Sequence, residues 1–145
     1  MTGNASNDHP PQQRAPRPMI ISRRREAARI VSKWRKPLFL HEWYFDLHYP
    51  EENLNESTIA DISANPTYLK AHIRIFPLWS DLSPTLREET LVHELLHCHT
   101  QRLWDLAQNL LNGVLVPHHS IHDEVELLTQ RLTNVVFYSS LLKRP

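Results

Sequence analysis

The stretch "TLVHELLHCHTQRLW", residues 90–104, holds three histidines, a glutamate and the chain's one cysteine among leucines. Its apolar residues fall around much of a helical circumference, which predicts a buried helix. Ser83 followed by Pro84 is a typical helix start, with a hydroxyl N-cap and proline at the first helical position. Gly113 is a residue at which this helix can end. We therefore expect one helix from Pro84 to about Asn112.

Within this helix, His93 and His97 are four residues apart and so lie on one face, one turn apart. Two imidazoles at that spacing can bind one zinc ion at about 2.0–2.1 Å each. Glu94 can reach a metal-bound water and act as general base. The alternative is a helix whose histidines face solvent or make core hydrogen bonds. Polar groups in a buried helix need partners, which favours the metal site.

Cys98 and His99 lie beside this motif but point elsewhere. At 3.6 residues per turn they are about 100° and 200° around the helix from His97. Neither can join the His93–His97 pair without breaking the helix. We expect Cys98 to be a small core residue, and His99 to pack or hydrogen-bond on the far side.

A third ligand is expected from the next helix, residues 120–141. The acidic candidates are Asp123, Glu124 and Glu126, and the histidine candidates are His118, His119 and His122. Glu124 lies near an apolar stripe of residues 128, 132 and 135, whereas Glu126 shares a face with Thr129 and Thr133. Close packing against a metal-binding helix favours small side chains around the ligand. This favours Glu126 over Glu124 and leaves both glutamates and the histidines open.

Upstream of the motif, the pattern predicts a helix over 21–36 and strands over 42–49, 58–64 and 68–76. The order is then helix, three strands, helix, helix. Such an order indicates an α+β fold with one twisted, mostly antiparallel sheet. Residues 1–18 are rich in proline, glutamine and asparagine and are expected to form a disordered tail. We expect residues 19–145 to form a single domain.

The composition fits one globular domain, with 145 residues, 41% hydrophobic and 22% charged. Basic and acidic residues number 16 each, so net charge does not favour nucleic acid or membrane as a partner. Basic residues are nevertheless concentrated in 14–36. This segment is either a solvated helix face or an arm that docks on nucleic acid or a partner. A single cysteine excludes an intrachain disulfide, and no secretory signal or membrane span is recognisable. We expect a cytoplasmic protein.

Residues 93–97, His-Glu-Leu-Leu-His, followed by a helix bearing Glu126, resemble the gluzincin metallopeptidases, whose general form is seen in thermolysin. The short chain looks most like their small stand-alone members in phages and bacteria, including regulatory peptidases that act on repressors. The resemblance covers about residues 21–141. It implies a zincin-like fold, a Zn²⁺ cofactor and hydrolysis of protein or peptide substrates, with His93, His97 and Glu126 as ligands and Glu94 as base.

The resemblance also implies positioning and substrate-binding residues. In that group the glutamate ligand is followed by small and apolar residues in a pattern that Thr129, Leu132, Thr133 and Val136 match. Its fourth following position often carries Asp or Asn, which orients the first histidine; here Gln130 offers an amide. A peptide substrate adds to a strand at the sheet edge above the zinc. The candidate is the strand over 68–76, centred on His72, Ile73 and Arg74.

Overall fold

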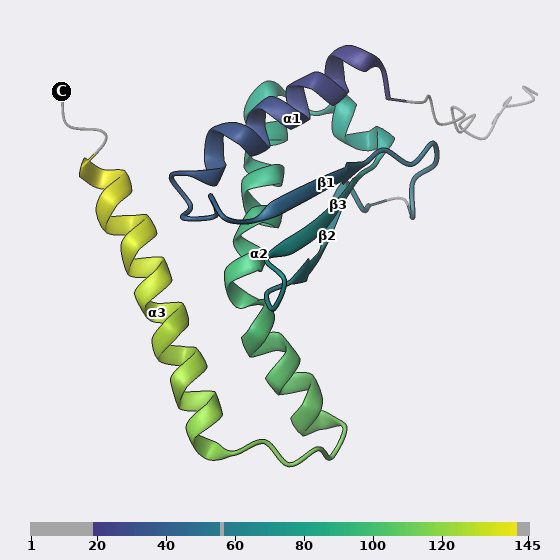
Figure 1. Cartoon of the computed structure of the whole chain (residues 1–145). Helices are drawn as coiled ribbons and strands as arrows, with labels where there is room; N and C mark the ends of the chain where they lie inside the picture. The colour runs from purple at the N-terminus through teal and green to yellow at the C-terminus, as the bar shows by residue number, and fades with distance from the viewer. Residues whose placement is uncertain (1–18, 56, 142–145) are drawn as a thin grey trace, which may run out of the picture.

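The computed structural model describes residues 19–55 and 57–141 (Figure 1). Its elements are α1 (Ile21–Arg35), β1 (Tyr44–His48), β2 (Ala60–Asn65), β3 (Lys70–Ile75), the 3₁₀ helix η1 (Pro77–Asp81), α2 (Pro84–Leu111) and α3 (His118–Leu141). The predicted α+β class and the order of helix, three strands and two helices are confirmed. The predicted tail, residues 1–18, lies outside the described residues.

The three strands form a mixed sheet in the order β1-β3-β2. β1 is parallel to β3, whereas β2 is antiparallel to β3. The prediction of a mostly antiparallel sheet was therefore wrong. A short turn over 66–69 makes β2 and β3 an antiparallel hairpin. The longer connection over 49–59 carries the chain to the far side of β3, so that β3 pairs between its two predecessors.

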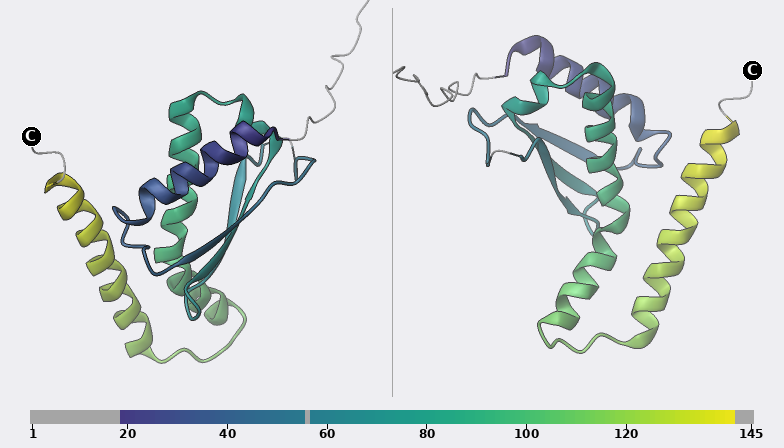
Figure 2. Two further views of the ribbon diagram at one scale, coloured as in Figure 1. Left: turned by 45° about the horizontal axis from the view of Figure 1, so that its top comes forward. Right: turned by 180° about the vertical axis from the view of Figure 1, so that it is seen from behind.

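The core lies between one face of the sheet and the helices α1 and α2, which share one side of the sheet (Figure 2). Alternation along β3 aims Ala71, Ile73 and Ile75 into this core, where each is fully buried. The helices contribute Ala27, Ile30 and Val31 from α1, and Leu91, Leu95 and Cys98 from α2. The opposite face of β3 carries Lys70, His72 and Arg74. The sheet thus has one apolar face and one polar face.

The boundaries of α2 follow the predicted signals. Ser83 is the N-cap, and its Oγ accepts a hydrogen bond from the Leu86 amide at 3.3 Å. Gly113, with φ of +74°, follows the helix in the left-handed region that glycine adopts readily. Within the described residues, no helix has the length and apolar character that crossing a membrane requires.

After the loop, α3 runs antiparallel to α2 (Figure 1). It begins at His118, two residues before the predicted start. Val135 packs against the core cluster. Among the α3 side chains that the structure describes, however, none is fully buried. α3 is therefore the least embedded of the long helices, which matters for the predicted third ligand.

Candidate metal centre

α2 places His93 and His97 side by side on its surface. Their ring centroids are 5.0 Å apart, with 83° between the ring planes. Both residues are exposed. The predicted placement on one helical face is confirmed, and two imidazoles at this separation can reach a common ion.

Glu94 points inward, between the helix and the sheet. Its exposed fraction is 8%. With His97 and Asp61 it lines a hollow of about 700 Å³, and with His93 it lines a second hollow of about 460 Å³. Ala60 borders both hollows. The carboxylate therefore lies where the two hollows meet, beside the histidine pair and against β2.

The electrostatics of the motif follow from this burial. Burial raises the pKa of Glu94 to about 7, and the negative charge of Asp61 adds to the rise. Burial also lowers the pKa of His97, with the neighbouring His93 contributing. His97 is consequently neutral at neutral pH, the form in which imidazole binds a metal.

The strand beside this site is β2, and not the predicted strand over 68–76. His72, Ile73 and Arg74 lie on β3, which pairs with strands on both sides and is the centre of the sheet. The backbone N–H and C=O groups of β3 are hydrogen-bonded to the strands on either side. β3 therefore has no free edge with which a peptide could pair. β2 is one of the two edge strands, and its residues 60–62 line the larger hollow.

Sequence reasoning missed the position of β2 beside the site, and Asp61 with it. The alternation in 58–64 identifies a strand, but nothing in it says which strand is outermost. Asp61 accepts two hydrogen bonds from the Arg74 guanidinium, at 2.8 and 2.5 Å. That ion pair holds Asp61 on the polar face of the sheet, so its influence on Glu94 is electrostatic.

The structure does not bring Glu126 to the histidine pair. α3 packs on the α2 face that carries Arg102, whose Nη1 donates to Glu124 at 3.2 Å. His99 shares this side and is about 200° around α2 from His97. Glu126 is exposed. In the described part of the chain, no group of three metal-binding side chains includes it or the histidine pair. Glu126 as the third ligand stays a prediction.

The remaining candidates on α3 are also away from the pair. Gln130, predicted to orient a ligand histidine, is exposed and donates to Asn134 at 3.1 Å. His118 and His119 are exposed at the start of α3, and exposed His122 lies 3.8 Å from Asp123. The site therefore consists of two adjacent imidazoles and a buried carboxylate, and none of the described side chains is in place as a third ligand.

The predictions for Cys98 and His99 are confirmed. Cys98 is a buried core residue, and burial raises the pKa of its thiol to about 12. His99 is buried on the far side, with its Nε2 2.8 Å from the carbonyl oxygen of Leu38. Neither residue competes for the ion that the pair would bind.

Comparisons of this chain with protein-family models, with curated proteins and with solved structures give no match. A function for the chain is therefore inferred from the chemistry of the site. The residues that carry that chemistry are His93, Glu94 and His97.

Proposed function

We propose that this chain is a zinc-dependent metallopeptidase of the gluzincin kind. The observation that carries the proposal is the arrangement of His93, Glu94 and His97. Two exposed imidazoles stand 5.0 Å apart, and a buried carboxylate beside them lines both adjoining hollows. This is the set of groups that metal-assisted peptide hydrolysis needs on one helix.

Each residue has a defined part in this proposal. His93 and His97 would hold Zn²⁺ through one ring nitrogen each. The ion would supply Lewis acidity and make a water molecule acidic near neutral pH. A carboxylate oxygen of Glu94 would take the proton from that water. Its position in a hollow, away from bulk solvent, makes the proton transfer more effective than it would be in open water.

The substrate in this proposal is an extended peptide on the outer edge of β2. A strand edge offers main-chain hydrogen bonds to such a peptide without regard to its sequence. The adjoining hollow supplies apolar contacts from Ile62, Leu103, Trp104 and Ala107. Trp104 is 59% exposed, which leaves a large aromatic surface available for a substrate side chain.

The third ligand would be Glu126, which requires α3 to take another position around α2 when the ion binds. Two observations support such a change. No described side chain of α3 is fully buried. Val125, Leu127 and Leu132 are 42%, 37% and 39% exposed, so apolar surface on α3 is still available for closer packing. Glu124 is the alternative ligand, and it would have to leave Arg102.

Metal content tests the proposal. Zinc-loaded protein is passed over a desalting column, and the zinc that remains is counted by mass spectrometry. We expect the double change His93→Ala/His97→Ala to lower the wild-type content by about one zinc per chain. Glu126→Gln should do the same, and Glu124→Gln, the matched control two residues away, should not. Equal zinc in the wild type and the histidine double variant would overturn the proposal.

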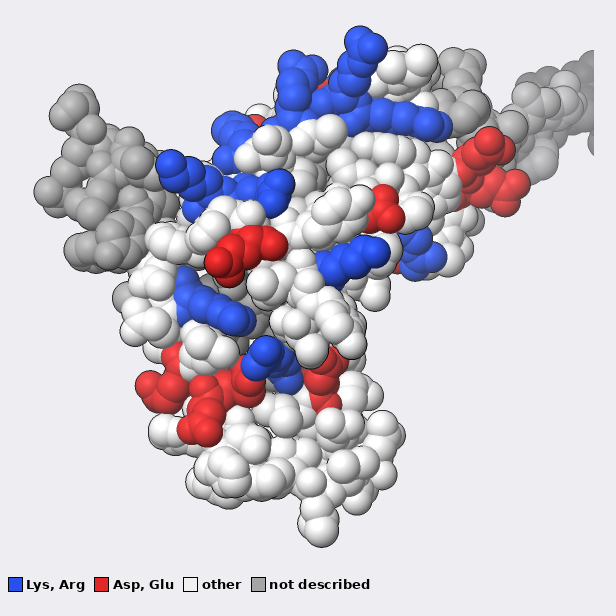
Figure 3. Space-filling model, viewed as in Figure 1, with Lys and Arg blue, Asp and Glu red and all other residues white. Residues whose placement is uncertain are grey.

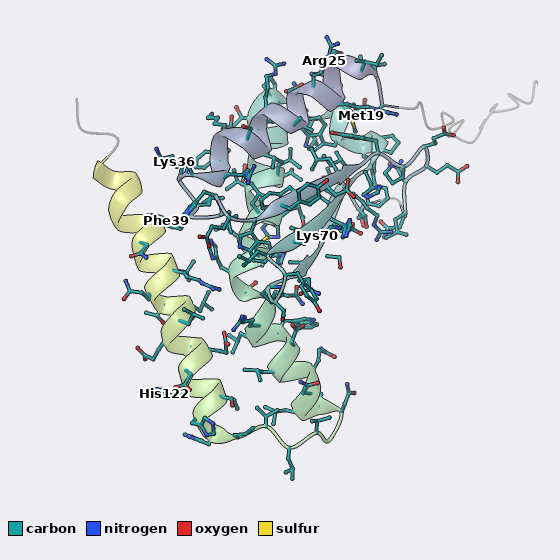
Figure 4. All side chains as sticks on the ribbon, in the orientation of Figure 1. Met19, Arg25, Lys36, Phe39, Lys70 and His122 are labelled. Carbon is teal, nitrogen blue, oxygen red and sulfur yellow. The ribbon has the colours of Figure 1, made fainter. Side chains whose placement is uncertain are left out.

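A second candidate function, binding of nucleic acid, is favoured by the surface of α1. Lys and Arg side chains lie together over this helix (Figure 3). Arg25, in the first half of α1, and Lys36, directly after the helix, are labelled in Figure 4. Two basic residues are used in ion pairs, Arg23 with Glu26 and Lys33 with Glu88. Arg25, Arg29 and Lys36 remain exposed.

Salt dependence tests this second candidate. Binding to a DNA duplex is measured over a range of salt concentrations. Each phosphate contact adds about −0.9 to the slope of log K against log salt. The triple change Arg25→Gln/Arg29→Gln/Lys36→Gln should therefore flatten the slope. An unchanged slope would remove α1 as a nucleic-acid surface, without bearing on the zinc proposal.

A further inference from the structure

The polar face of the sheet carries a second cluster of metal-binding side chains, away from α2. β1 contributes Asp46 and His48, and β3 contributes His72. In the parallel register Asp46 lies opposite His72, and His48 lies opposite Arg74. Residues at alternate positions of neighbouring strands project from the same face, so the three side chains meet above the sheet.

The geometry of this cluster is tight. His48 Nε2 lies 3.1 Å from Asp46 Oδ2, and His72 Nδ1 lies 3.3 Å from the same oxygen. The two imidazole centroids are 5.8 Å apart. Across residues 19–55 and 57–141, this is the one group of three His, Cys, Asp or Glu whose ligand atoms all lie within 4.8 Å of one another.

We propose that Asp46, His48 and His72 form a zinc-binding site on the open face of the sheet. Zinc bonds of about 2.0–2.1 Å in a tetrahedron place neighbouring ligand atoms about 3.3–3.4 Å apart. The two separations from Asp46 Oδ2, 3.1 and 3.3 Å, are close to that edge length. The two imidazole nitrogens lie within 4.8 Å of each other, so rotation of the two imidazoles alone could complete the site around an ion. Two nitrogens and one carboxylate oxygen are also ligands that Zn²⁺ prefers.

The surroundings favour a cation in this place. Arg74 is the nearest basic side chain by register, but its guanidinium is paired with Asp61 through two hydrogen bonds. The Lys70 ammonium lies 5.6 Å above the ring of Tyr44. Both positive charges thus contact other groups. The Asp46 carboxylate contacts the two histidines instead.

The fourth position of the site would face water. The side chains of Asp46, His48 and His72 are 39%, 55% and 45% exposed. His48 and His72 also line a hollow of about 590 Å³ on this face. The site would therefore exchange its ion with solvent. It would also link β1 to β3, so zinc should stabilise the folded chain.

The competing explanation is a pair of hydrogen bonds from the two histidines to Asp46 Oδ2, with no affinity for metal. The two explanations differ in the effect of removing an imidazole. Hydrogen bonds predict no change in zinc binding. A metal site predicts that the loss of one ligand of three weakens binding at least tenfold.

Equilibrium dialysis of the metal-free full chain against ZnCl₂ tests the proposal. Two backgrounds are compared, the wild type and His93→Ala/His97→Ala, so that α2 cannot contribute in the second. In the second background we expect about one zinc per chain. Adding His48→Gln or Asp46→Asn should weaken that binding at least tenfold. His41→Gln, which changes an exposed histidine ahead of β1, is the matched control and should have no effect.

The outcomes separate this proposal from the peptidase proposal. Zinc bound in the His93→Ala/His97→Ala background and lost with His48→Gln supports the sheet site, whatever α2 does in the wild type. If His48→Gln and His72→Gln leave the zinc affinity of the His93→Ala/His97→Ala protein unchanged, the proposal is overturned. It is also overturned if the His93→Ala/His97→Ala protein takes up no zinc. A rise in Tm with ZnCl₂ that Asp46→Asn abolishes would be a second, independent readout.

Discussion

Arg87 fixes the first turns of the histidine-bearing helix to the rest of the molecule. Only 5% of the residue is exposed. Its Nε donates to Glu26 on α1 at 2.8 Å, and its Nη1 donates to the Leu82 carbonyl. Its guanidinium lies 5.6 Å from the ring centroid of Trp79, whose Nε1 donates to the Arg87 carbonyl at 3.0 Å. One side chain thus joins α1, η1 and α2.

Replacing Arg87 by methionine should destabilise the fold. The change keeps an unbranched stem but removes hydrogen bonds to a carboxylate and to a carbonyl. Hydrogen bonds that involve a charged group contribute about 1.5–3 kcal/mol each, so the loss of two should cost roughly 3–6 kcal/mol. Urea denaturation measures it. Arg29→Met, at an exposed position of α1, should stay within about 0.5 kcal/mol of the wild type. Equal stability of the two variants would contradict this role of Arg87.

Two carboxylates join the elements α1 and α2. Burial opposes ionisation of Glu26, but hydrogen bonds and charge from Arg23 and Arg87 outweigh it and lower its pKa. Hydrogen bonds from Lys33 and from the Trp34 indole lower the pKa of Glu88. Both groups therefore bind a proton less readily in the folded chain than in the unfolded chain.

This packing predicts a loss of stability in acid. A carboxyl whose pKa is lower in the folded state stabilises the fold above its unfolded pKa. That stability is lost as the pH falls through the lowered folded value. Urea midpoints, measured from neutral pH into the acid range, should therefore fall. In Glu26→Gln/Glu88→Gln the fall should be shallower, from a lower starting value. A double variant with the wild-type acid slope would show that other carboxyls control it.

The packing of α3 shows why the third ligand could not be predicted at the level of single elements. The sequence offered two predictions for the face of α3 that meets α2. The small side chains predicted the face with Glu126 and Thr129, whereas the apolar stripe predicted the face with Glu124. In the structure Thr129 and Glu126 are exposed, whereas Val135 packs against the core and Glu124 reaches Arg102. The face near Glu124 is thus the one that meets α2, although Leu132 of its apolar stripe is 39% exposed.

At the scale of the whole molecule, sequence signals within one element predicted the features that lie within that element. The Ser83 cap and the Gly113 stop gave the limits of α2, and the i, i+4 spacing placed His93 beside His97. The order of the sheet depends on how a long connection crosses it, and nothing within a strand records that. For the same reason, sequence reasoning missed the cluster of Asp46, His48 and His72, because a pairing register brings it together.

The proposed peptidase and the proposed sheet site occupy different parts of this architecture. The histidine pair lies on α2 and lines hollows that β2 also lines, whereas the second cluster lies over β1 and β3. Substitutions in one should leave the other intact. Zinc stoichiometry alone therefore cannot test catalysis, and a measurement of bond cleavage has to do so.

The most direct test compares zinc-loaded wild type with Glu94→Gln on a diverse library of unstructured peptides, with products identified by mass spectrometry. The amide keeps the size of the side chain but cannot take the proton, and general bases contribute about 10²–10⁴-fold to rate. We predict that wild type cleaves library peptides, and that Glu94→Gln retains zinc and loses cleavage by that factor. Glu52→Gln, the same change at an exposed position in the connection between β1 and β2, should cleave like the wild type. Equal cleavage by wild type and Glu94→Gln, or no cleavage by zinc-loaded wild type, would contradict the peptidase proposal.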